Sequence, residues 1–321
     1  MSTPSSPAEK VNTAFPVLLA IVLGASVALQ SRTNSELAKR SGDPFFASAA
    51  SFSVGTVLIT LAVALLPAGH RGLHRAWHAF RHDRQPFWLF LGGLSGSWLV
   101  LTQTFTVGPL GVALFTVAIV AGQTSSGLLI DRIGMGNMPA KPFTARRLVG
   151  AALALIAVLI AAVPRLRQDI PLVLMVLPLI AGCLMAYQQA ANGQVRHLSN
   201  SMLAATFINF QIGGAVLVGI FVVRALLHLG HTSYPTTWWL YSGGLVGLAY
   251  IAGNTIVVRM VGVLVTVMSS LCGQLAASIA LDLVWPGGSG HVTGLTIVGA
   301  ALTLLAVTIA SQPTRLPWRR R

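Results

Sequence analysis

The chain has 321 residues, of which 54% are hydrophobic and only 9% are charged, and its formal net charge is +14. A soluble domain carries about 25% charged residues, so this composition excludes a water-soluble globular protein. The basic residues are scattered over many connections instead of being gathered in one domain. This distribution favours anionic lipid headgroups as their partners and argues against nucleic acid.

Apolar residues come in stretches of about 20, the length that a helix needs to cross about 30 Å of hydrocarbon. In chain order, the predicted spans are 15–32, 45–67, 87–106, 109–130, 146–163, 171–192, 203–227, 237–257, 261–283 and 292–311. The first stretch lacks a signal-peptide cleavage site, so we expect it to be a retained helix. The sequence therefore predicts an all-α membrane protein with ten transmembrane helices.

Uncommon residues of the first half recur at fixed spacing in the second. The pairs separated by 158 positions are Gln30 and Gln188, Asn34 and Asn192, Phe52 and Phe210, and Gly55 and Gly213. The pairs separated by 151 positions include Gly92 and Gly243, Gly96 and Gly247, Gln123 and Gln274, and Asp131 and Asp282. Such self-similarity indicates an internal repeat.

Each repeat holds five predicted spans. Because five is odd, the second repeat must enter the bilayer from the opposite side, which is the inverted 5+5 arrangement of many secondary transporters. The predicted organisation is a tail at 1–14, a first five-helix repeat at 15–163, a second and inverted repeat at 171–311, and a basic tail at 312–321. The membrane side that holds both termini would carry 15 of the 21 basic residues. The positive-inside rule therefore predicts that both tails are cytoplasmic.

Amide side chains inside apolar spans are the first candidates for a site, because polar groups in hydrocarbon usually face a cavity or another helix. Gln30 and Asn34 lie four residues apart on one helix face, and Gln188 and Asn192 repeat this arrangement next to Tyr187. These residues would line an uncharged polar pocket for a substrate. They would equally serve as hydrogen-bonded contacts between helices.

A second matched set lies in the fourth and ninth spans. Gln123 and Gln274 are the deeper members and are predicted to contact substrate. Asp131 and Asp282 lie in the last turn of each span, where they could couple transport to protons or form interfacial ion pairs. Phe52 and Phe210 in the second and seventh spans could stack on a substrate, although an aromatic residue in an apolar span usually belongs to the core.

The sequence has no constellation of residues suited to catalysis, and we expect neither an enzyme nor a cofactor. Cys183 and Cys272 lie in apolar spans without metal-ligand spacing, as small packing residues do. The segment 67–86 has histidines at every fourth position. That spacing allows a metal site, but Arg and Trp residues between them favour an interfacial helix. The histidines concerned are His70, His74, His78 and His82.

Three runs and their counterparts in the second half resemble the YdcZ-like branch of inner-membrane exporters in the drug/metabolite transporter superfamily. The runs are Gly24 to Asn34, Gly92 to Gly96, and Gly122 to Asp131, with counterparts at 188–192, 243–247 and 273–282. The resemblance covers nearly the whole chain and identifies it as the fused form of two five-span units. It implies alternating-access transport in the bacterial plasma membrane.

One departure bears on the substrate. The small multidrug transporters of this superfamily have a glutamate in their first helix that exchanges protons for cationic drugs, whereas spans 15–32 and 171–192 contain no acid. An uncharged or zwitterionic metabolite fits better. The sequence predicts a secondary transporter, with a non-transporting membrane scaffold or lipid-interacting protein as the alternative. It leaves open the substrate, coupling to a proton or another cation, and pairing as a homodimer.

Overall fold

The structure is a computed structural model and describes residues 14–135, 140, 142–166, 171–285 and 292–311. Every regular element in this part of the chain is helical, so the predicted all-α class is confirmed for the described residues. The elements are α1 (Ala14–Ser41), α2 (Pro44–Leu65), α3 (Pro67–Arg81), the 3-10 helix η1 (Phe87–Leu91), α4 (Gly92–Leu110), α5 (Val112–Ile133), α6 (Ala145–Leu166), α7 (Leu172–Ser199), α8 (Met202–Leu226), the 3-10 helix η2 (Trp238–Tyr241), α9 (Gly243–Val284) and α10 (Gly294–Ser311). Apart from Ala14, the two predicted tails lie outside the described residues.

Eight helical segments of the described chain are long and apolar enough to cross a membrane. They are α1, α2, α5, α8, α10, most of α6 and α7, and the part of α9 from Val265 to Val284. The predicted count of ten spans is therefore not confirmed. Helix α4 is not among the eight, and its apolar run is interrupted by hydroxyl and amide side chains such as Ser95, Thr102 and Gln103.

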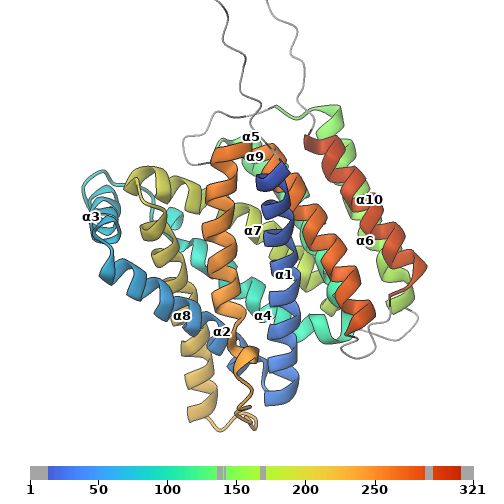
Figure 1. Cartoon of the computed structure of the whole chain (residues 1–321), viewed down its shortest axis with the longest axis horizontal. Coiled ribbons are helices and arrows are strands. Elements are labelled where there is room, and N and C mark those ends of the chain that lie inside the picture. The colour runs from blue at the N-terminus through green and yellow to red at the C-terminus, as the bar shows by residue number, and fades with distance from the viewer. Residues whose placement is uncertain (1–13, 136–139, 141, 167–170, 286–291, 312–321) are drawn as a thin grey trace, which may run out of the picture.

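The predicted eighth and ninth spans form the single element α9, which reverses direction. The Ser270 hydroxyl donates a hydrogen bond to Asn254 Oδ1 at 3.3 Å, yet 16 residues of straight helix would separate these positions by about 24 Å. Figure 1 shows α9 leaving η2, crossing one end of the bundle, and running back. We call the part before this reversal the first leg and the part after it the second leg.

Helix α1 extends well beyond the end predicted at residue 32. It has 28 residues and ends at Ser41, so Glu36 lies within the helix and not in a loop, and its Oε1 accepts from Arg40 Nε at 2.8 Å. A helix of this length spans about 42 Å, more than the hydrocarbon thickness of about 30 Å. The charged last turns can therefore remain helical outside the hydrocarbon. Charged residues after position 32 thus did not mean that the helix had ended.

The segment 67–86 contains the predicted additional helix, α3. Its small residues Gly69, Gly72, Ala76 and Ala79 are buried, while Trp77 is 59% exposed. Arg75 Nε donates to the Ser199 carbonyl at the end of α7, with a distance of 2.7 Å. The helix is thus confirmed, and its position at the membrane surface stays a prediction.

Helices from the two halves cross through matched glycines. A Cβ on Gly24 would lie 1.8 Å from the Ser270 carbonyl oxygen, where α1 crosses the second leg of α9. A Cβ on Gly182 would lie 2.1 Å from the Ile119 carbonyl oxygen, where α7 crosses α5. Only glycine permits such close approach of two helix backbones. Each half is therefore packed mainly against helices of the other.

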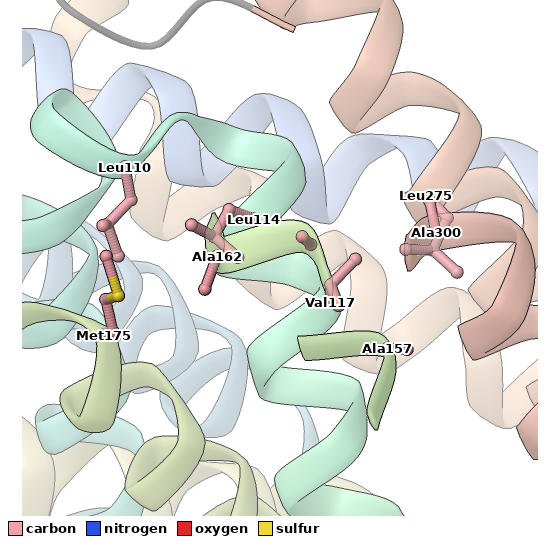
Figure 2. Close-up of a cluster of buried hydrophobic side chains, with 9 residues drawn as sticks. Leu110, Leu114, Val117, Ala157, Ala162, Met175, Leu275 and Ala300 are labelled. Carbon is pink, nitrogen blue, oxygen red and sulfur yellow. The ribbon is translucent and has the colours of Figure 1, made fainter. Parts of the chain in front are cut away.

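The hydrophobic core also crosses between the halves. Figure 2 shows one cluster in which Leu275 of α9 and Ala300 of α10 lie beside Val117 of α5, while Met175 of α7 lies beside Leu110 of α4. All of these side chains are at most 7% exposed. The packing joins the two halves into one bundle with a shared interior.

Candidate substrate cavity

A cavity of about 1100 Å³ lies between the helices of both halves. It extends from Ser31, Gln103 and Phe115, which lie deep in the bundle, to Asp131, Arg147 and Arg196. We call the region around these last three residues the Asp131 end. The opposite region, beyond Ser31, is occupied by Arg32, Val112 and Asp282, and we call it the Asp282 end.

The cavity lining is apolar with polar groups distributed along it. Val27, Leu99, Phe115 and Ile119 contribute apolar surface. The uncharged polar side chains of the lining are Ser31, Gln103, Gln123, Thr124, Thr144, Gln189, Asn192, Thr206, Tyr250, Asn254, Thr266, Ser270, Gln274 and Ser311. Polar groups on a mainly apolar wall are typical of small-molecule sites, which commonly have volumes of about 300–1,000 Å³.

The matched glutamines Gln123 and Gln274 both line this cavity. Gln123 is on α5 and its Nε2 lies 3.6 Å from Met185 Sδ, while Gln274 is on the second leg of α9 and is 9% exposed. The two amides thus belong to different halves but face the same space. Their sequence positions predicted a common pocket, and the fold brings them to one.

The two matched asparagines, Asn34 and Asn192, lie in different surroundings. Asn192 lines the cavity and donates from Nδ2 to Asn209 Oδ1 at 3.2 Å. Asn34 is fully buried and does not line it. Its Nδ2 donates to Gln103 Oε1 at 2.7 Å, and Gln103 Nε2 donates to Ser31 Oγ at 3.0 Å. These bonds tie α1 to α4 at the deep end of the cavity.

Gln30 and Gln188 do not line the cavity. Gln188 Nε2 donates to Asn209 Oδ1 at 2.9 Å and packs against Gly96, where a Cβ would lie 2.8 Å from the amide nitrogen. Gln30 packs in the same way against Gly247, at the same 2.8 Å. For this pair the contacts between helices that the sequence left as an alternative are present.

The predicted aromatic contacts lie elsewhere in the bundle. Phe52 and Phe210 are each 5% exposed, and their ring centroids are 5.2 Å apart. They fill the space above Gly213 and Gly55 within a hydrophobic cluster. The Tyr187 hydroxyl donates to the Trp88 carbonyl. None of these three aromatic residues lines the cavity.

The two matched aspartates have different surroundings. Asp131 lines the cavity, and its Oδ2 accepts from Arg147 Nη2, with the Asp131 side chain 27% exposed. Asp282 is 5% exposed, and its two carboxylate oxygens accept from the backbone amides of Val112 at 2.9 Å and Ala113 at 2.8 Å. Asp282 therefore caps the N-terminus of α5 from another helix. Proton coupling by either residue stays a prediction.

Arg32 is the residue that sequence reasoning missed at the Asp282 end. It is 1% exposed, its Nη2 donates to the Trp285 carbonyl, and its guanidinium lies 5.3 Å from the centroid of the Trp285 ring. The charges of Asp282 and Glu36 attract it. Arg32 is the last residue of the predicted span 15–32, and its charge beside Gln30 and Asn34 was a usable signal.

Sequence reasoning also left Tyr250, Asn254, Ser270 and Arg147 out of the candidate set. A usable signal existed for Asn254, which occupies the position matched to Gln103, and both side chains line the cavity. The others lie on helix faces that only the packing defines. In the described part of the chain, no group of three or more His, Cys, Asp or Glu side chains has a geometry suited to a metal ion.

A family model described as "Putative inner membrane exporter, YdcZ" matches the chain twice, at residues 15–160 and 173–309. The chain belongs to this family. It is therefore a multi-pass inner-membrane protein of a transporter family. One solved crystal structure is similar in fold, with a TM-score of 0.52 and 15% identity over 94% of this chain and 97% of the other. A search of curated proteins finds no match.

The two segments that match the YdcZ exporter family each contribute one glutamine, Gln123 or Gln274, to the cavity. They also contribute one aspartate each to its surroundings, Asp131 beside the cavity and Asp282 beyond it. Each family unit thus carries the same glutamine and the same aspartate, but the two aspartates have different surroundings.

Proposed function

We propose that this exporter-family protein is a secondary transporter that works by alternating access between two inverted five-helix repeats, at residues 15–163 and 171–311. The two legs of α9 serve as the eighth and ninth spans, and α4 as the third. Small molecules would bind in the cavity between the repeats. Transport would follow from rearrangement of the repeats around this site.

Matched contacts support the inverted repeat. A Cβ on Gly93 would lie 2.2 Å from the Asn209 carbonyl oxygen, and one on Gly244 would lie 2.0 Å from the Ser51 carbonyl oxygen. These four residues form two equivalent pairs under the spacings found in the sequence. In Figure 1, α1 begins and α10 ends at the same side of the bundle, as expected for an even number of spans. With the positive-inside rule, this is the cytoplasmic side.

The observation that carries the proposal is the meeting of Gln123 and Gln274 in one cavity. A scaffold has no need for a space of about 1100 Å³ in its centre, since an unfilled interior costs packing energy. Gly127 and Gly193 line the same space, and a Cβ added to either would meet no atom within 4 Å. The cavity has room for a substrate.

The lining supports an uncharged or zwitterionic substrate. Asp131 is the one carboxylate in the described lining, and it is paired with Arg147, while Arg196 adds a further positive charge. This balance disfavours organic cations. The amides of Gln123, Gln274 and Asn192 can donate and accept hydrogen bonds, which suits hydroxyl, amide or amino-acid groups.

A thermal-shift screen of the purified protein against several hundred metabolites and cationic drugs tests the proposal, because a ligand that binds the folded state raises its stability. We expect uncharged or zwitterionic compounds to raise the melting temperature. Gln123→Ala and Gln274→Ala should each weaken binding about tenfold, equivalent to about 1.4 kcal/mol. Compounds that bind should also be transported across the membrane of proteoliposomes that contain the protein.

Gln211→Ala is the matched control, because Gln211 Nε2 bonds to Thr60 Oγ1 at 2.8 Å and does not line the cavity. It should leave binding unchanged. Binding that survives both cavity substitutions would place the site elsewhere. A screen in which no compound stabilises the protein would favour the scaffold or lipid-interacting alternative.

A further inference from the structure

The matched aspartates stand at the ends of corresponding helices, and Asp282 joins the two repeats. It lies near the C-terminus of α9 and accepts hydrogen bonds from Val112 and Ala113 at the start of α5. The Asp282 carboxylate packs closely against Gly111, since a Cβ added to Gly111 would lie 2.7 Å from Oδ2. Gly111 itself has a φ of +83°. Asp282, Val112 and Ala113 are buried and do not line the cavity.

The partner segment of Asp282 has its own counterpart in the second repeat. Gly111 and Val112 correspond to Gly262 and Val263 at the same spacing of 151 positions that relates Asp131 to Asp282. An exchange of conformations between the repeats would therefore bring Asp131, at the end of α5, to the start of the second leg of α9. The sequence provides both halves of this alternative contact.

We propose that Asp282 and Asp131 are positioning residues that close opposite ends of the cavity in turn. In the present state Asp282 caps α5 and closes its end, while Asp131 lines the cavity beside Arg147. In the opposite state Asp131 would cap the second leg of α9 through the backbone amides of residues 263 and 264, and Asp282 would leave Val112. This inference rests on the proposed alternating access and names the residues that determine which end of the cavity is closed.

The asparagine pair supports the same exchange. Asn34 is buried at the deep end of the cavity with its Nδ2 bonded to Gln103, whereas its counterpart Asn192 lines the cavity. Asp282 and Asp131 show the same division between sealed and lining positions. If the protein alternates between two states that exchange the roles of its repeats, matched residues must have different surroundings in each state.

A buried carboxylate is a suitable closing group for physical reasons. It accepts two backbone N–H groups that would otherwise be unsatisfied at the helix N-terminus, and the helix dipole adds a favourable interaction with its negative charge. Hydrogen bonds to a charged group are stronger than neutral ones. Losing this cap leaves buried donors unpaired, so each end prefers to be either fully closed or fully hydrated.

The test measures access to the cavity from each side of the membrane. Cys183 and Cys272 are replaced with alanine, and Leu99→Cys places one reporter thiol in the cavity lining. Oriented vesicles are then treated with a membrane-impermeant maleimide from either side. This variant is the parent of the substitutions below. In it, we expect the reporter thiol to be labelled faster from the membrane side of Asp131 than from the side of Asp282.

Asp282→Asn should raise the ratio of Asp282-side to Asp131-side labelling about tenfold. Asp131→Asn should not raise it, and in the Asp282→Asn background it should bring the ratio back toward the parent, since it weakens the opposite closed state. Asp282→Glu retains the charge with a longer side chain and should give an intermediate ratio. This second variant keeps the test decisive if Asp282→Asn fails to fold.

Asp83→Asn is the control for the loss of a carboxylate. The Asp83 side chain is 55% exposed, its Oδ2 lies 3.8 Å from His78 Nδ1 of the same repeat, and Asp83 does not line the cavity. It should not change the ratio. An unchanged ratio in Asp282→Asn and Asp282→Glu, or an increase in Asp131→Asn, would overturn the inference. Because labelling needs no substrate, this failure is distinct from a failed ligand screen, which concerns the proposed function.

Discussion

Each end of the cavity has one aspartate of the matched pair, yet one aspartate is buried and the other is partly exposed. At the Asp282 end, Val112, Ala113 and Arg32 are at most 1% exposed. At the Asp131 end, the Asp131 side chain is 27% exposed and Gly193 faces open space. The difference does not lie in the type of these two residues, because both are aspartates.

What differs is the partner of each carboxylate. Asp282 bonds to the backbone of the other repeat, whereas Asp131 bonds to Arg147, which is 16 residues along the same chain segment. The first contact spans the repeats and the second does not. The comparison therefore indicates that contacts between repeats hold the closed end, and three substitutions test it by their effects on stability and access.

Arg32→Ala should have the largest effect. It removes a buried cation from Trp285 and leaves the Asp282 charge without it, and breaking a buried ionic arrangement typically costs about 3–5 kcal/mol. We expect a large fall in melting temperature and in folded yield, measured in detergent. Arg40→Ala is the control, since Arg40 also lies over a tryptophan ring, at 5.4 Å from the Trp239 centroid, but is 43% exposed. Equal losses in both would contradict the importance of burial at this end.

Gly111→Ala should have an intermediate effect. Gly111 has φ +83° and ψ 159°, a conformation that is essentially restricted to glycine, and a side chain there costs about 1–3 kcal/mol. The added Cβ would also press on Asp282 Oδ2. We expect more maleimide labelling of the Leu99→Cys reporter from the Asp282 side. Gly127→Ala, in helix α5 with no atom within 4 Å of the new Cβ, should leave labelling unchanged. No change in the Gly111 variant would show that this turn does not hold the end closed.

Arg147→Ala should have the smallest effect. The Arg147 side chain is 17% exposed and its partner Asp131 is 27% exposed, and ion pairs with access to water contribute about 0.2–1 kcal/mol. The melting temperature should fall by much less than in Arg32→Ala. The neighbouring and exposed Arg146→Ala should cause no measurable fall. A loss as large as that of Arg32→Ala would mean that the two ends are equally packed.

A small part of the cavity lining was accessible to prediction because the repeat restricts where matched residues lie. Gln123 and Gln274 were paired by sequence alone, and they line one cavity. Gln30, Phe52 and Tyr187 were chosen as polar or aromatic groups within apolar spans, but such groups also pack helices together. A residue type inside a span does not reveal which face of the helix meets a neighbour, so these three could not be distinguished from cavity residues.

The sequence by itself determined that the chain is an all-helical membrane protein and that it contains a duplicated unit, because span length and hydrophobic composition follow from the bilayer. It also determined which residues correspond between the two units. Only the tertiary structure decided which member of each pair is sealed and which lines the cavity. Sequence symmetry specifies two equivalent arrangements, and a single folded state must adopt one of them, so Asp282 caps α5 while Asp131 lines the cavity.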